Sequence, residues 1–365
     1  MDRRREATLD VMRGLAILLV MFFHLRIDTG IAGIDRALLP VVDAGWIGVD
    51  LFFVLSGFLV GRLVLQEIAT TGTFDRQRFL VRRIVRLWPV LFVYLAAMIL
   101  AGGAAGWQMA WPVLLHVQNY SRNVPSHLWS LAVEEHFYLA VAWLLPIVAI
   151  RYRAGMVALA LVALIVGVMA WRMTGWHGGV AIVDLQWQTQ YRADAIAIGV
   201  ALAWIAVHRP VWLMRLSAYR AAWFMVAVLG FAIVAGIDDW RDRFGPGLIV
   251  SDIAAAALLV GLHGAVIPSF LATPARALAA LGTLAYPLYI WHPSVADATD
   301  TLLRSWPVTM PFVATAIRYG LAIGVAWLIA VGIERPFMAL RHRRPDVEQT
   351  GNQQPSRFIA IEKHY

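Results

Sequence analysis

The first apolar stretch of the chain, residues 8–25, carries a guanidinium and an imidazole in a segment otherwise suited to a membrane helix. Arg13 and His24 are 11 residues apart, close to a whole number of helical turns, so they share one face. At the rise of an α-helix they would lie roughly 16 Å apart, and Asp10 would neighbour Arg13. An imidazole inside a membrane helix and turned from lipid is a candidate for proton transfer. The alternative is that Arg13 reaches a lipid headgroup and His24 caps the helix at the opposite interface.

A carboxylate, Asp50, stands near the start of the next apolar segment, residues 46–66. A carboxylate this early in an apolar helix needs a partner, and we expect an arginine or histidine of the first helix to provide it. Such a contact would raise the basicity of His24 and fix its tautomer. The alternative is that Asp50 lies at the membrane interface. Four glycines of this segment allow close helix approach: Gly45, Gly48, Gly57 and Gly61.

Two arginines, Arg83 and Arg86, begin the third apolar segment and are three residues apart, so they project from one helical face. Guanidinium groups on one face suit a phosphate or pyrophosphate, because each offers a fork of paired donors. Arg76 and Arg78 add to the positive field. The alternative is a stop-transfer cluster that binds anionic lipid.

The fourth apolar segment opens with a polar group of residues. Ser130 and Glu134 are four residues apart and share a helical face. Helix capping accounts for one carboxylate, because the helix dipole favours negative charge in the first turns. It does not account for Ser130, Glu134, Glu135 and His136 together in a segment that enters the membrane. We therefore take Glu134 as a candidate catalytic residue, and Ser130 and His136 as candidate substrate-binding residues.

Later polar residues carry weaker signals. Arg192 with Asp194 is typical of a structural pair, although Arg192 is also a candidate substrate-binding residue. His292, at the end of a later apolar segment, is typical of a hydrogen-bonded interface histidine. The histidines are dispersed without metal-ligand spacing, so we expect no metal. The absence of cysteine excludes disulfides, thiolate metal ligands and thioester-linked enzyme intermediates.

The composition is that of a polytopic membrane protein. The 365 residues are 60% hydrophobic and only 15% charged, whereas a soluble domain is about half apolar and a quarter charged. The net charge of +8 indicates membrane topology and contact with anionic lipid, not nucleic acid. We expect an all-α fold of about ten transmembrane helices. Their approximate ranges are 8–26, 46–66, 80–101, 128–149, 155–171, 193–207, 221–236, 247–266, 276–292 and 311–333.

The loops predict the topology and the domain limits. Arginines are about twice as frequent on one set of loops, which places both termini in the cytoplasm. We expect a membrane domain over residues 1–344 and a polar, disordered C-terminal tail over residues 345–365. Residues 107–119 form either a loop or a re-entrant segment. No internal repeat indicates a two-fold transporter architecture.

Seven segments between residues 9 and 337 resemble, in the same order, the acyltransferase-3 family of integral membrane O-acyltransferases. These are LDVMRGLAILLVMFFH, GWIGVDLFFVLSGFLV, FLVRRIVRLWP, HLWSLAVEEHFYL, YRADAIAIGV, LGTLAYPLYIWHP and IERPF. Each segment is a weak signal alone, but their common order is a strong one. The family's first-helix arginine and histidine fall on Arg13 and His24. Its paired-arginine motif falls on Arg83 and Arg86, and its Ser-Leu-x-Val-Glu motif on residues 130–134.

The resemblance implies a multi-pass protein of the cytoplasmic (inner) membrane that moves an acyl group, usually acetyl, from acyl-CoA to a hydroxyl. The acceptor would be a cell-surface polysaccharide, a lipid-linked glycan or a small glycosylated metabolite. The implied partners are acyl-CoA, the glycan acceptor and membrane lipids, with no nucleic acid. Some members carry an extracytoplasmic esterase-like domain, which we do not expect in this sequence.

These residues suggest one mechanism. The paired arginines hold the CoA phosphates, Arg13 guides the pantetheine arm, and His24 takes the proton of the acceptor hydroxyl. Either Glu134 or Asp50 orients the imidazole. The roughly 16 Å between Arg13 and His24 is comparable to the reach of pantetheine. Alternatives are a relay through an acylated His24, a glycan transporter that uses His24 as a proton relay, and a scaffold, which would leave the buried polar residues unexplained.

Overall fold

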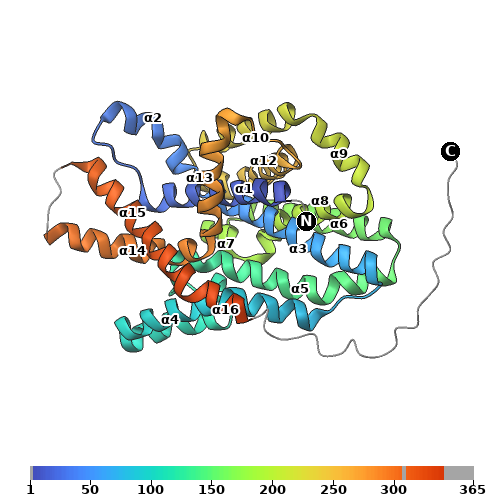
Figure 1. The fold of residues 1–365 in the computed structure, drawn as a ribbon, viewed down its shortest axis with the longest axis horizontal. Coiled ribbons are helices and arrows are strands. Elements are labelled where there is room, and N and C mark those ends of the chain that lie inside the picture. The colour runs from blue at the N-terminus through green and yellow to red at the C-terminus, as the bar shows by residue number, and fades with distance from the viewer. Residues whose placement is uncertain (1–2, 306–309, 341–365) are drawn as a thin grey trace.

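The computed structural model describes residues 3–305 and 310–340, which form an all-helical fold (Figure 1). The α-helices are α1 (Arg3–Leu25), α2 (Ala32–Asp43), α3 (Ile47–Thr71), α4 (Arg76–Leu114), α5 (Trp129–Arg151), α6 (Ala154–His177), α7 (Ile182–Trp187), α8 (Ala193–His208), α9 (Pro210–Ala218), α10 (Arg220–Ala235), α11 (Trp240–Phe244), α12 (Pro246–Leu262), α13 (Ala272–Thr283), α14 (Ala285–Ser305), α15 (Pro311–Ile329) and α16 (Arg335–Leu340). A π-helical turn, Ala330–Glu334, joins α15 to α16. The predicted all-α class is confirmed over this part of the chain, and the predicted tail, 345–365, lies outside it.

Six helical stretches within the described ranges are long and apolar enough to cross a membrane. They are Ala7–Leu25, Ala32–Thr71, Arg76–Leu114, Ser126–Arg151, Ala154–His177 and Pro311–Ala339. The bent pair α8–α9, with an angle of 112° at the break, would make a seventh. The expected ten spans are therefore not confirmed. The apolar helices α10 and α12 have 16 and 17 residues, short of the ~20 that a bilayer core requires, and the predicted span 276–292 is divided between α13 and α14.

Helix α3 packs between α1 and α8, and glycines make both approaches possible. A Cβ atom at Gly48 would lie 2.3 Å from the carbonyl oxygen of Ala16 on α1. A Cβ atom at Gly57 would lie 2.0 Å from the carbonyl oxygen of Ile196 on α8. Both distances are far inside van der Waals contact with rigid backbone, so a side chain at either position would separate the helices. The close approach predicted for these glycines is confirmed.

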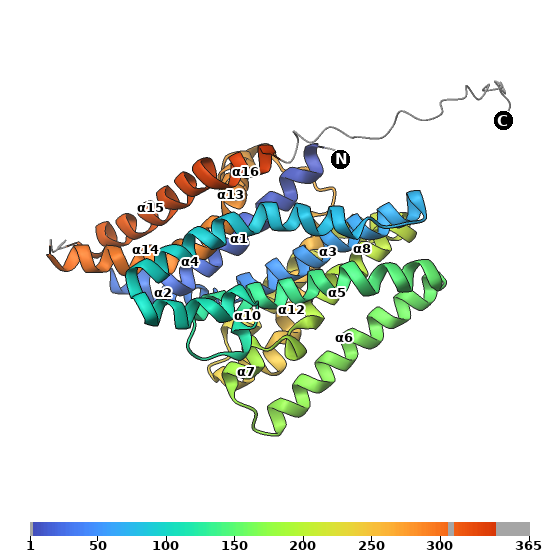
Figure 2. The ribbon, with the colours of Figure 1, turned by 90° about the horizontal axis from the view of Figure 1, so that it is seen from below.

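Helix α4 reverses direction at Gly103, whose φ of 54° and ψ of −127° lie outside the helical region. Glycine tolerates this positive φ because it has no Cβ atom. The rings of Trp88, before the reversal, and His116, after α4, have centroids 5.7 Å apart. The second arm therefore runs back along the first (Figure 2). Residues 107–114 are therefore helical and form the second arm of this hairpin, which ends at Leu114. They are not a loop, and the re-entrant alternative stays a prediction.

The helices that carry the candidate residues meet in one buried apolar cluster. It draws side chains from α1, α3, α4, α5, α8, α12, α14 and α15. Figure 2 shows α14 and α15 side by side at one end of the molecule and α6 on the other flank. The candidate residues thus project from helices that pack tightly against each other, and this rigidity is what positions a site precisely enough for chemistry.

Candidate active site

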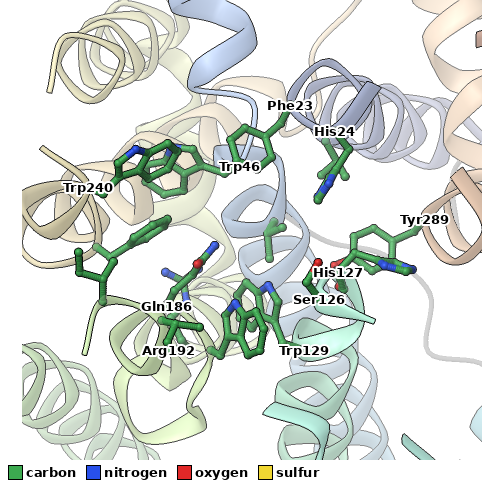
Figure 3. Close-up of a pocket in the computed structure, with 16 residues that line it drawn as sticks. Phe23, His24, Trp46, Ser126, His127, Trp129, Gln186, Arg192, Trp240 and Tyr289 are labelled. Carbon is green, nitrogen blue, oxygen red and sulfur yellow. Dashed lines mark hydrogen bonds between the residues drawn. The ribbon is translucent and has the colours of Figure 1, made fainter. Parts of the chain in front are cut away.

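Two cavities of similar size lie among these helices. The arginine cavity has a volume of about 540 Å³, and its charged lining consists of Arg13, Arg62, Glu67, Arg83, Arg86, Glu134 and Glu334. The aromatic cavity has a volume of about 530 Å³, and its lining includes Phe23, His24, Trp46, His127, Trp129, Trp187, Arg192, Trp240 and Phe244 (Figure 3). Val49 and Tyr289 line both cavities, so the two spaces approach each other at these residues.

The arginine cavity collects the guanidinium groups that the sequence singled out. Arg83 and Arg86 both line it from α4, which confirms that they share a face. Arg13 joins them from α1 and forms an ion pair with Asp10, as their spacing predicted. The guanidinium carbon of Arg83 lies 4.2 Å from the centre of the Tyr138 ring. This cation–π contact holds the arginine at the cavity wall without neutralising its charge.

Glu134 lies on the wall of the arginine cavity, on the same face of α5 as Ser130, as predicted. The Ser56 hydroxyl donates to one carboxylate oxygen of Glu134 at 2.8 Å, and the Tyr138 hydroxyl donates to the other at 3.4 Å. The carboxylate therefore ties α3 to α5. Its hydrogen bonds in the described structure do not include His24, which lines the other cavity, so the expectation that Glu134 orients the imidazole is wrong.

Asp50 is fully buried and forms an ion pair with Arg192, while the Ser251 hydroxyl donates to its other oxygen at 2.5 Å. The expected partner on the first helix is therefore wrong, as is the proposed orienting contact with His24. The reason is rotational. Gly48 faces α1, and Asp50 follows it by two residues, or about 200° around the helix axis, so its side chain faces away from α1.

Arg192 and Asp194 do not pair with each other, contrary to the sequence-based expectation. Asp194 binds Arg172 instead, with an N–O distance of 2.7 Å, and Asp252 lies 3.8 Å from the same guanidinium. Arg192 reaches the aromatic cavity with its guanidinium carbon 5.3 Å from the centre of the Trp129 ring. These buried charges brace α3, α6, α8 and α12, because each ion pair joins two of the helices or their ends.

His24 lines the aromatic cavity and is exposed there (Figure 3). Its ring centre lies 5.1 Å from that of His292, and the His292 ring lies 5.7 Å from that of His127. The Nδ1 of His292 lies 2.9 and 3.0 Å from two carbonyl oxygens of the preceding turn of α14. A carbonyl only accepts, so Nδ1 carries the proton, and the buried Nε2 of the neutral ring is left as an acceptor with no partner in the described structure.

Tyr289 connects the histidines to the arginine cavity. Its hydroxyl donates to the His127 carbonyl at 2.5 Å, and the Ser130 hydroxyl donates to the Tyr289 oxygen at 2.6 Å. Ser130, a predicted substrate-binding residue, thus lines the arginine cavity with its hydroxyl engaged by Tyr289. The Tyr289 ring is held in place where the two cavities meet.

His136 is not part of either cavity lining. Its Nδ1 lies 2.8 Å from the hydroxyl of Thr189, before α8. Because His136 follows Glu134 by two residues, it points to the opposite side of α5. The structure therefore places His136 apart from the other predicted site residues, with its side chain joining α5 to the segment that precedes α8. Its predicted substrate-binding role stays a prediction.

Sequence reasoning missed four residues of the site. It gave no role to His127 or Tyr289, and it treated His292 as an interface residue, whereas His292 is fully buried against His24. Local signals existed: Tyr289 and His292 are three apart on one helix, and His127 precedes Ser130 by three. Glu334 was also missed, and the π-helical turn that ends at Glu334 is a distortion frequent at functional sites.

Within residues 3–305 and 310–340, no group of three or more histidine, cysteine, aspartate or glutamate side chains is placed to hold a metal ion. The polar groups of the site are imidazoles, hydroxyls, guanidinium groups, single carboxylates, amides and indole N–H groups. This set can bind an anion in one cavity and move a proton in the other.

The sequence model of the acyltransferase-3 family, described as an acyltransferase domain, matches residues 6–331. The chain belongs to this family. The match includes α4, nearly all of α1 and the three neighbouring histidines His24, His127 and His292, so the two cavities are built largely from the family's own domain. No solved structure matches the sequence of this acyltransferase-family chain.

Several curated relatives are similar to this family member. The peptidoglycan O-acetyltransferase OatA of Listeria monocytogenes is 25% identical over 366 residues, covering 90% of this chain and 54% of the relative. A Staphylococcus aureus (strain COL) protein, named provisionally as an O-acetyltransferase, is 25% identical over 363 residues, covering 90% of this chain and 56% of the relative. A Bacillus subtilis protein, named provisionally as a peptidoglycan O-acetyltransferase, is 27% identical over 315 residues. The chain spans about half the length of these relatives.

Proposed function

We propose that this chain transfers an acyl group, most simply acetyl, from acyl-CoA in the arginine cavity to a hydroxyl of a glycan or glycosylated acceptor in the aromatic cavity. The observation that carries the proposal is the arrangement of α1, which presents Arg13 to one cavity and His24 to the other. The names of the relatives support an acetyl donor, and two of them support a glycan acceptor.

The donor is assigned to the arginine cavity on electrostatic grounds. Four arginines and three glutamates line it, and the phosphates of CoA are strongly anionic. Arg83 and Arg86 project side by side and offer the paired donors that phosphate oxygens accept. Arg13, on a different helix, is available to the pantetheine arm or the thioester. The distribution of arginines among the loops favours a cytoplasmic side for this cavity, where acyl-CoA is made, in a multi-pass protein of the cytoplasmic membrane.

The chemistry requires a base, because the pKa of an alcohol is far too high for attack on a thioester at neutral pH. His24 takes the proton as the acceptor oxygen forms its bond to the acyl carbon. The carbon–sulfur bond then breaks, and the CoA thiolate receives the proton from His24. In this proposal His292 orients the base, because its unprotonated Nε2 has no partner in the described structure and can accept the N–H of the His24 ring, whose centre lies 5.1 Å from its own. This is the role first expected of Glu134 or Asp50.

The acyl group has to pass from the arginine cavity to His24, and Tyr289 stands at that passage with Val49. Its ring can move only if its hydrogen bonds to the His127 carbonyl and the Ser130 hydroxyl break. The thioester therefore displaces Tyr289 when it reaches the imidazole. In this way the acyl group is exposed to the acceptor only after the donor has bound and displaced Tyr289.

The direct test uses the purified protein in lipid nanodiscs with acetyl-CoA and short oligosaccharides. We expect free CoA thiol and acetylated sugar to form in equal amounts, measured by thiol titration and mass spectrometry. Export of unmodified oligosaccharide from proteoliposomes, without any acetylated product, would replace the proposal with a transport function.

A further inference from the structure

The short helix α7 lines the aromatic cavity with two polar side chains that make no hydrogen bond to any residue the structure describes. We propose that Gln186 and Trp187 bind a neutral pyranose ring of the acceptor and select which of its hydroxyls faces His24. This inference rests on the acyl transfer proposed above, and it adds the acceptor-reading residues to it.

Helix α7 is held firmly enough to form a binding wall. Leu185 is fully buried and belongs to the same buried cluster as Trp46 and Phe244. The two residues that follow it, Gln186 and Trp187, are only partly buried, and both line the aromatic cavity. A buried anchor directly before two cavity residues fixes their backbone while leaving their side chains accessible.

The hydrogen bonds of the same segment show why Gln186 is distinctive. The Gln188 amide donates to Asp184 at 2.7 Å, and the Gln190 amide donates to Gln188 at 2.6 Å. Both glutamines are therefore engaged with protein. The Gln186 amide has no such partner in the described chain, although it offers two donors and one acceptor. A sugar presents adjacent hydroxyls that both donate and accept, and these match a primary amide well.

Trp187 packs partly against the main apolar cluster and also lines the aromatic cavity. Trp240 is covered by the stacked Phe244 ring, 5.7 Å between centroids, and by Arg243, whose guanidinium carbon lies 4.4 Å from the ring centre. No comparable ring or cation contact covers Trp187 in the described structure, and its indole N–H has no hydrogen-bond partner there. The part of the indole that lines the cavity suits the C–H face of a pyranose, and its N–H suits a hydroxyl at the rim.

The remaining lining favours a neutral sugar over an anionic ligand. The guanidinium of Arg192 is already paired with Asp50, so it adds little net positive charge to the cavity. Trp46 is 4% exposed, and its indole N–H is buried without a hydrogen-bond partner in the described residues. The volume of about 530 Å³, apolar walls and few polar groups are typical of a site for a small organic molecule.

The geometry also explains how a hydroxyl would be selected. Figure 3 shows Gln186 and His24 on facing sides of the cavity. A pyranose held by Gln186 at one edge presents its opposite edge to the imidazole. Loss of the Gln186 contact would therefore let the ring turn, and the site of acylation would become less selective.

The test compares Gln186→Ala, Trp187→Ala and Trp187→Phe with two control substitutions, Gln108→Ala and Trp171→Phe, at exposed positions that line neither cavity. The probes are a nitrophenyl glycoside of N-acetylglucosamine and acetyl-CoA. We expect Gln186→Ala and Trp187→Ala to raise the acceptor KM about tenfold, the effect of one lost hydrogen bond or ring contact. Trp187→Phe keeps an aromatic face and should show a smaller rise. The acetyl-CoA dissociation constant of all three α7 variants should match that of the controls. The Gln186→Ala protein should acetylate more than one hydroxyl of the glycoside.

Equilibrium binding of the glycoside, without acetyl-CoA, separates this inference from the proposed transfer. Wild-type protein that binds the glycoside, and loses binding in the α7 variants, supports the sugar site even if no acetyl is transferred. The sugar site would be overturned, while the proposed transfer stands, if both Gln186→Ala and Trp187→Ala have the acceptor KM of the controls and acetylate the same hydroxyl. Absence of both binding and transfer in the wild type would overturn both.

Discussion

The two cavities are nearly equal in volume, about 540 and 530 Å³, but opposite in character. The arginine cavity is lined by guanidinium groups from α1 and α4, together with glutamates, and suits an anion. The aromatic cavity is lined by indoles and imidazoles, and its lining arginine, Arg192, is neutralised by Asp50. The difference teaches that a charged and an aromatic environment are kept apart, with Val49 and Tyr289 in both linings. Under the proposed function, this would separate the binding of a charged carrier from the activation of a hydroxyl.

The largest expected effect tests the base in the aromatic cavity. In His24→Ala, acyl transfer should fall roughly 10²- to 10⁴-fold, the contribution of a positioned general base. The affinity for acetyl-CoA should not change, because His24 lines the other cavity. Transfer rates and CoA binding would be measured on the same preparation, with His136→Ala as the matched control outside both cavities. A folded His24→Ala protein with near wild-type transfer would remove the base assignment.

The next effect tests the arginine cavity. The double substitution Arg83→Ala with Arg86→Ala should weaken acetyl-CoA binding roughly 100-fold, because a hydrogen bond to a charged group contributes about 1.5 kcal/mol or more. The control is Arg76→Ala with Arg78→Ala, which removes the same charge from α4 outside the cavity lining. Acetyl-CoA affinity would be measured by titration calorimetry. An equal loss of affinity in the two double variants would mean that only the positive charge of α4 matters and that neither Arg83 nor Arg86 contacts the donor.

The third prediction asks whether Asp50 is structural, as its burial against Arg192 indicates. Asp50→Asn leaves a buried guanidinium without its counter-charge and should lower the free energy of unfolding by about 3 kcal/mol. Replacing both partners, with Asp50→Asn and Arg192→Gln, should recover part of this loss. Thermal unfolding in detergent gives the measurement. A catalytic Asp50 would instead show lost transfer at unchanged stability.

The smallest expected effect concerns the boundary between the cavities. Tyr289→Phe keeps the ring but loses the hydrogen bonds to the His127 carbonyl and the Ser130 hydroxyl. We expect transfer to rise by up to about 30-fold, because the ring can then leave the passage without breaking two hydrogen bonds of about 1 kcal/mol each, with unchanged CoA affinity. Tyr152→Phe, at an exposed position, is the control. Wild-type transfer in Tyr289→Phe would show that the hydroxyl has no part in the passage.

Features set by helical periodicity were predictable from the sequence. The shared face of Arg83 and Arg86, the shared face of Ser130 and Glu134, and the contact of Arg13 with Asp10 all follow from spacings of three or four residues. The number of membrane spans was less predictable. Apolar segments such as α10 and α12 are clear in the sequence, but composition alone does not settle whether such short helices cross a bilayer.

The sequence by itself therefore determined the helical fold class, the family, the arginine face of α4 and the imidazole of α1. Only the tertiary structure decided which groups meet across helices. Asp50 meets Arg192, 142 residues away, because the glycine faces of α3 set its rotation against α1 and α8. His24 of α1 meets His292 of α14, 268 residues further along the chain. Periodicity reports the face of one helix that a side chain occupies, whereas the partner of that face depends on how separate helices pack.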